Sequence, residues 1–114
     1  MTHIFILEHQ PHRIEQISGE LEKEGYRVTA FGKEAFNPET FECTQYDLAV
    51  LNLYPDSIRT WALHSDLRKR CPDFPMLVVL LRNIYGLRVL KNSINQILKK
   101  RECSRTDYQE CFLA

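Results

Sequence analysis

The stretch YDLAVLNLYPD, residues 46–56, decides the fold. Residues 48–51 form a continuous apolar run, which is typical of a strand buried on both faces of a parallel sheet. Asn52 follows this run, and the polar residues after it predict a loop. In a parallel sheet such a position lies at the carboxyl edge, where these folds usually place their functional groups.

Two further apolar runs predict strands of the same kind. Residues 4–7 (IFIL) end abruptly at Glu8, and residues 76–81 (MLVVLL) are the most hydrophobic part of the chain. Residues 26–31 (YRVTAF) alternate, as an edge strand does. We therefore expect the carboxyl ends of three strands to converge, at Glu8-His9, Asn52 and Leu80-Leu81.

Helical patterns separate these runs. After Pro11, apolar residues recur at helical spacing as far as Gly25, which is a typical stop. Asn37 resembles the cap of a short helix, and residues 57–70 are helical in character. A final apolar stripe runs through residues 87–101 and comprises Leu87, Leu90, Ile94, Ile97 and Leu98. Alternating strands and helices predict a parallel sheet covered on both faces.

Composition narrows the function classes. The chain has 114 residues, enough for one domain, with 15 basic and 15 acidic side chains. This balance gives no case for nucleic acid. No apolar stretch approaches the roughly 18 residues that a membrane span needs. Because the four cysteines form no CxxC pair and no secretory signal precedes them, we expect free thiols in a reducing cytoplasm.

Residues 3 to about 83 resemble a response-regulator receiver domain. The opening IFILEHQPHRIEQISGELEKEGYRV is similar to the family's first strand, acidic cluster and first helix. YDLAVLNLYPD is similar to its third strand and phosphoacceptor loop, and RKRCPDFPMLVVLL to the end of its third helix and its fourth strand.

The resemblance implies a degenerate phosphoacceptor pocket. The family's acidic pair falls on Glu8 and His9, its phosphoacceptor on Asn52, and its switch Ser or Thr on Leu80. An asparagine cannot form an acyl phosphate, and a single carboxylate makes a poor Mg²⁺ site. The simpler role for Asn52 is to cap the turn with side-chain hydrogen bonds.

The C-terminal part departs from the family. Residues 87–101 resemble the last helix, whereas the fourth helix, the fifth strand and the family's Lys-Pro pair have no counterpart. We therefore expect a flavodoxin-like α/β/α sandwich with a parallel sheet of order 2-1-3-4, in which the fifth strand is missing or replaced by the tail. Residues 1–101 would form the receiver-like domain and residues 102–114 a C-terminal tail.

These features predict a phosphorylation-independent signalling module that is not an enzyme and has no cofactor. It would bind a protein partner or dimerise, because a hydrophobic strand at a sheet edge is a template for pairing. The expected interaction surface comprises Met76, Val78, Leu80, Leu87, Leu90 and Ile94.

Alternatives remain open at this point. One is a flavodoxin-like protein that binds a small molecule, or a metal through Glu8, His9 and His12, although their spacing matches no metal motif. Another is a receiver that keeps some phosphorelay role.

Overall fold

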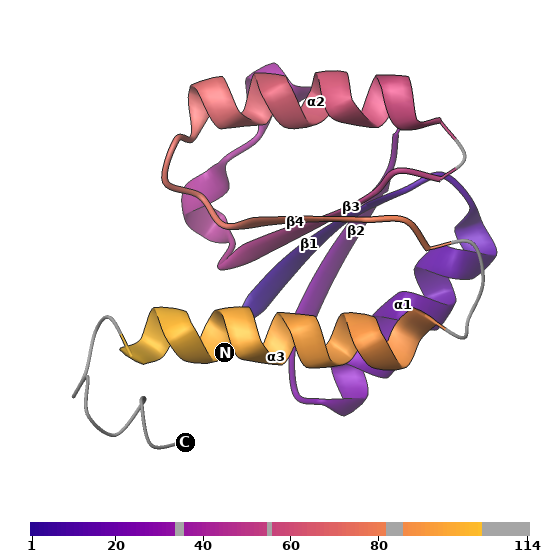
Figure 1. Cartoon of the computed structure of the whole chain (residues 1–114), viewed down its shortest axis with the longest axis vertical. Helices are drawn as coiled ribbons and strands as arrows, with labels where there is room; N and C mark the ends of the chain where they lie inside the picture. The colour runs from indigo at the N-terminus through magenta and orange to yellow at the C-terminus, as the bar shows by residue number, and fades with distance from the viewer. Residues whose placement is uncertain (34–35, 55, 82–85, 104–114) are drawn as a thin grey trace.

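A computed structural model describes residues 1–33, 36–54, 56–81 and 86–103. Residues 101–103 are described by their backbone alone. Across the described ranges, four strands and three α-helices alternate, with two short 3₁₀ turns between the second and third strands (Figure 1). The elements are β1 (His3–Glu8), α1 (Pro11–Lys23), β2 (Arg27–Gly32), η1 (Pro38–Thr40), η2 (Cys43–Gln45), β3 (Leu48–Asn52), α2 (Ser57–Arg70), β4 (Met76–Val79) and α3 (Leu87–Cys103).

The sheet is parallel throughout and has the order β2-β1-β3-β4. This confirms the predicted order 2-1-3-4 and the three-layer α/β/α architecture. The register places Leu7 beside Leu51, and Asn52 beside Val79, so the carboxyl ends of β1, β3 and β4 meet at one edge. Within the described residues, β4 is the outer strand on its side of the sheet.

Alternation along the buried strands divides the core in two. In β1, Ile4 and Ile6 face α1 and α3, whereas Phe5 and Leu7 face α2. Figure 1 shows this arrangement, with α2 on one side of the sheet and the other two helices on the opposite side. Because both faces are covered, β1 and β3 carry the continuous apolar runs that parallel strands require.

The apolar stripe of α3 packs inward. Leu87, Leu90 and Ile94 are buried against α1 and the sheet, in the same cluster as Ile17 and Leu21. These three leucine and isoleucine side chains cannot form part of an exposed interaction surface, so that part of the prediction was wrong. The physical reason is that α3 packs on the same face of the sheet as α1 and buries its apolar side chains there.

The opposite face is covered by α2 and by the segment between β2 and β3. Phe41 lies at the centre of an aromatic cluster, with ring centroids 4.7 Å from Phe5 and 5.8 Å from Phe74. Cys43 and Cys71 form a disulfide that joins this segment to the end of α2. The expectation of free thiols was therefore wrong for this pair, because the fold brings two cysteines 28 positions apart into contact.

The predicted helix boundaries rest on identifiable caps. Asn37 accepts a hydrogen bond from the Glu39 backbone at 3.0 Å, and Asp56 caps α2 through the Arg59 backbone at 3.1 Å. Gly25 follows α1 with a φ of 92°, a conformation that side-chain-bearing residues rarely adopt. In the described part of the chain, no helix is both long and apolar enough to cross a bilayer. The predicted tail lies largely outside the described residues.

Candidate functional site

The predicted pocket lies where β1, β3 and β4 end. Glu8, the last residue of β1, is fully buried, and Asn52, the last residue of β3, is 2% exposed. The Asn52 Nδ2 atom donates a hydrogen bond to Glu8 Oε2 at 2.6 Å. The two residues that the sequence assigned to the acidic and phosphoacceptor positions are thus in direct contact.

The side-chain amide of Asn52 uses its whole hydrogen-bonding capacity inside the protein. Besides Glu8, Nδ2 donates to the Leu81 carbonyl oxygen at 3.0 Å. Oδ1 accepts from the backbone N–H groups of Leu81 at 2.9 Å and Tyr54 at 3.2 Å. An amide offers two donors and two acceptor sites, and all are occupied. Asn52 therefore ties the end of β3 to β1, to its own loop and to the residue after β4.

The other Glu8 oxygen is also engaged. Oε1 accepts from the backbone N–H groups of His9 at 3.0 Å and Gln10 at 3.3 Å. The guanidinium of Arg13 donates to the Leu81 carbonyl oxygen, which therefore receives two hydrogen bonds. The hydrogen bonds that Glu8 accepts offset the cost of burying its side chain, because a carboxyl group without donors is strongly destabilising in an apolar interior.

Thr60 secures the loop that follows Asn52. Its side chain is fully buried, and Oγ1 lies 2.8 Å from the Asp56 carbonyl oxygen and 3.2 Å from the Asn52 carbonyl oxygen. The hydroxyl thus couples the first turn of α2 to the end of β3.

Lys33 is a residue of the pocket that the sequence did not reveal. It follows β2, is 1% exposed, and its Nζ donates to the Tyr54 carbonyl oxygen at 3.4 Å. Burial lowers the pKa of Lys33, while the negative charges of Glu8 and Asp56 oppose that change. The pairing of β2 with β1 could have suggested this position for Lys33, because Gly32 lies beside Glu8 at the end of the sheet. The lysine of the receiver pattern follows the fifth strand, whereas Lys33 follows the second.

The remaining predicted residues do not join the contact between Glu8 and Asn52 through their side chains. His9 is exposed and meets Glu8 through its backbone N–H. Leu80 is 57% exposed. No group of three or more His, Cys, Asp or Glu side chains suited to a metal ion occurs among the residues that the structure describes.

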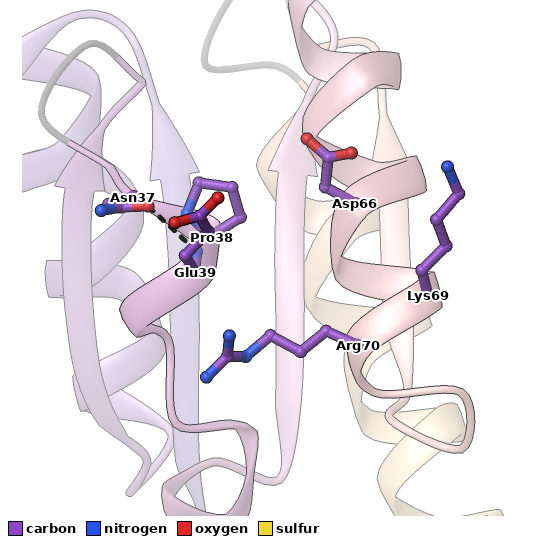
Figure 2. A pocket seen from close by; sticks show the side chains of 6 residues that line it. All are labelled: Asn37, Pro38, Glu39, Asp66, Lys69 and Arg70. Carbon is purple, nitrogen blue, oxygen red and sulfur yellow. Dashed lines mark hydrogen bonds between the residues drawn. The ribbon is translucent and has the colours of Figure 1, made fainter.

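An open groove of about 520 Å³ lies on another part of the surface, between η1 and α2. Figure 2 shows Arg70 extending from α2 toward η1, with Asn37 and Glu39 opposite it. Asp66, Lys69 and Pro38 complete the lining. Charges of both signs face this groove, so it has no single electrostatic preference.

The order of the sheet and the helices on both of its faces match the fold of response-regulator receiver domains. The response regulator TrrA from Thermotoga maritima, in complex with Mg²⁺ and BeF, is similar at 20% identity and a TM-score of 0.63, over 84% of this chain and 98% of that one. A chain of the complex between the histidine kinase ThkA and TrrA gives 22% identity and a TM-score of 0.56, covering 75% and 73%.

The non-phosphorylated receiver domain of HemR from Leptospira biflexa is similar at 24% identity and a TM-score of 0.54, covering 80% of this chain and 75% of that one. No family model and no curated protein matches the sequence. These likenesses confirm the receiver fold that the sequence predicted.

Proposed function

We propose that this chain is a signalling module of the receiver type that works without phosphorylation and without being an enzyme. The observation that carries the proposal is the saturated amide of Asn52, which makes all four of its hydrogen bonds to Glu8, Leu81 and Tyr54. Its nitrogen is a poor nucleophile, and its oxygen is already shared by two backbone N–H groups. A neutral amide also adds no charge with which to hold Mg²⁺.

A phosphotransfer assay tests this proposal. The protein is incubated with acetyl phosphate and Mg²⁺, and its intact mass is compared before and after. We expect no change in mass. The addition of one phosphoryl group to the native chain, lost in the Asn52→Ala variant, would contradict the proposal.

The outer edge of β4, which no other described strand covers, supports contact with a protein as the means of signalling. The carbonyl oxygens of Pro75 and Val79 bond to β3 at 3.1 and 2.7 Å. Because a parallel strand alternates the direction of its backbone groups, those of Met76 and Val78 point outward. Leu80 adds an exposed apolar side chain just beyond this edge. The proposed surface is therefore Met76, Val78 and Leu80, and its occupant is an extended segment of a signalling partner or a second copy of the chain.

Sedimentation velocity over a wide concentration range tests self-association. Val78→Pro removes an outward N–H and leaves the ladder to β3 intact, so it should shift a dimer toward monomer. Val89→Lys, at a site 68% exposed on α3, is the matched control and should leave the distribution unchanged. A strict monomer at high concentration contradicts dimerisation and leaves a different partner protein as the occupant.

We also propose a cytoplasmic location.

A further inference from the structure

The disulfide between Cys43 and Cys71 holds the segment that connects β2 and β3. In the described part of this connection only the three-residue turns η1 and η2 are regular. Cys43 begins η2, Cys71 follows α2, and their Cα atoms are 6.6 Å apart. The disulfide is thus the covalent link between this irregular segment and a regular helix.

The two sulfur-bearing residues differ in access. Cys71 is 5% exposed, whereas Cys43 is only half-buried. An open groove of about 540 Å³ is lined by both cysteines and extends over Tyr46, Arg70 and Phe74. Asp47 and Asp73 also line it, so the groove does not select a reactant by charge. The groove therefore offers a small or extended thiol an approach to the disulfide from the Cys43 side.

We propose that Cys43–Cys71 is a thiol–disulfide exchange site whose reactant is a dithiol reductant. Disulfides are uncommon in reducing compartments, and those that form there are usually transient or redox-sensing. This inference uses the proposed cytoplasmic location for the identity of the reductant, but not the proposed loss of phosphorylation.

The exchange proceeds in two balanced steps. A thiolate of the reductant attacks Cys43 Sγ, the S–S bond breaks, and its electron pair leaves on Cys71 Sγ, which takes up a proton. The second thiolate of the reductant then attacks the reductant's own sulfur in the mixed disulfide, and Cys43 leaves and is protonated. Two electrons and two protons pass to the protein, and the dithiol becomes a disulfide.

Reduction removes the covalent tie of a segment that is otherwise held by non-covalent contacts. Some of these reach β1, where the Gln45 carbonyl oxygen lies 3.1 Å from His3 Nδ1 and the Phe41 ring centroid 4.7 Å from that of Phe5, and others lie within the segment. Tyr46 N–H bonds to the Cys43 carbonyl oxygen at 3.2 Å, and Gln45 N–H bonds to the Glu42 carbonyl oxygen at 3.1 Å. The Phe41 ring stacks on Tyr46 with centroids 5.2 Å apart, within the same segment. Loss of the covalent link should therefore loosen η1 and η2 and leave β1 and β3 protected, because local opening follows local contacts.

The first test treats the oxidised, folded protein with dithiothreitol and counts thiols by alkylation after acid denaturation, with peptide mapping to separate Cys43 and Cys71 from the other two cysteines. Both should become reducible at denaturant concentrations far below the unfolding transition, with the far-ultraviolet circular dichroism retained. Oxidised glutathione should restore the disulfide. Reduction only in step with global unfolding overturns the proposal, as does failure of the pair to form under oxidised glutathione.

Single-cysteine variants test the direction of attack. With Cys71→Ser, oxidised glutathione should form a mixed disulfide at Cys43 about tenfold faster than it does at Cys71 in the Cys43→Ser variant, because reactivity follows access. Equal or reversed rates overturn the assignment. If either variant does not fold, hydrogen exchange on the reduced native chain decides instead. Faster exchange at Gln45 and Tyr46 with unchanged β1 supports the proposal, and uniform exchange contradicts it.

Discussion

Replacing Asn52 by aspartate should be strongly destabilising at neutral pH, although it restores the residue type of the receiver pattern. The change removes the donor to Glu8 at 2.6 Å and the donor to the Leu81 carbonyl oxygen at 3.0 Å. A hydrogen bond to a charged group contributes about 1.5–3 kcal/mol and a neutral one about 1 kcal/mol. With the repulsion between two adjacent carboxylates added, we expect a loss of about 4 kcal/mol in the free energy of unfolding at pH 7.

The cost should depend on pH with a defined sign. The carboxylate of Glu8 raises the pKa of the introduced carboxyl in the folded state above its value in the unfolded chain. A raised pKa contributes stability below the unfolded value of about 3.9, and this contribution is lost as the pH rises through the folded value. The Asn52→Asp protein should therefore approach the native protein in stability near pH 4. Asn52→Ala, which removes the same bonds without adding a carboxyl, should show a cost that does not vary with pH in this way.

Urea unfolding of these variants at several pH values measures the effect. A double variant makes the test sharper, because Glu8→Gln with Asn52→Asp exchanges the donor and the acceptor across the same contact. It should recover about 2 kcal/mol relative to the sum of the single changes, as coupling energies of contacting groups do. A cost below about 1 kcal/mol for Asn52→Asp, with no coupling, would refute the hydrogen-bond arrangement on which the proposed function rests.

Three further predictions concern Thr60, Lys33 and the disulfide. Thr60→Val should cost about 1–2 kcal/mol in urea unfolding, because it removes a buried hydroxyl that lies 3.2 Å from the carbonyl oxygen of the buried Asn52 and 2.8 Å from that of Asp56. Thr44→Val, at an exposed site, is the control, and an equal cost for both variants would count against this prediction. Since burial lowers the pKa of Lys33 below 10.5, native stability should rise as the pH increases toward that value. Lys33→Met should abolish this alkaline rise, and a persistent rise would show that another group causes it. The double variant Cys43→Ala with Cys71→Ala removes a disulfide that closes a loop over 28 positions, so the free energy of unfolding should fall by about 3–4 kcal/mol. Thermal unfolding that does not differ from that of the native chain would contradict this stabilising role.

Local sequence patterns were sufficient for most of the secondary structure, because most elements obey a short-range rule. The strand expected over residues 76–81 ends at Val79, however, and the short turn η2 was not predicted. The Asn37 cap and the helix from Ser57 to Arg70 appear at the predicted residues. The contact between Glu8 and Asn52 was also accessible, since parallel strands bring their carboxyl ends together. Each of these inferences needs only the period of the chain and the direction of the strands.

The features that escaped prediction depend on long-range geometry. Lys33 reaches the pocket because β2 lies beside β1, and no motif marks a lysine after an edge strand. The disulfide requires the segment from η2 to fold against the end of α2. Leu87 was assigned to the surface because its stripe alone does not reveal which face of the sheet the helix covers.

The arrangement around Asn52 also bears on how a signal could be transmitted. A switch needs an element with two arrangements and an input that binds one of them more tightly. Here the backbone N–H and carbonyl groups of Leu81, just beyond β4, are both held by the Asn52 amide. No change of charge at position 52 is available to release them, since an amide does not titrate. Under the proposed function, a protein partner at the β4 edge would therefore have to supply the differential binding itself, and occupancy should follow its concentration by mass action.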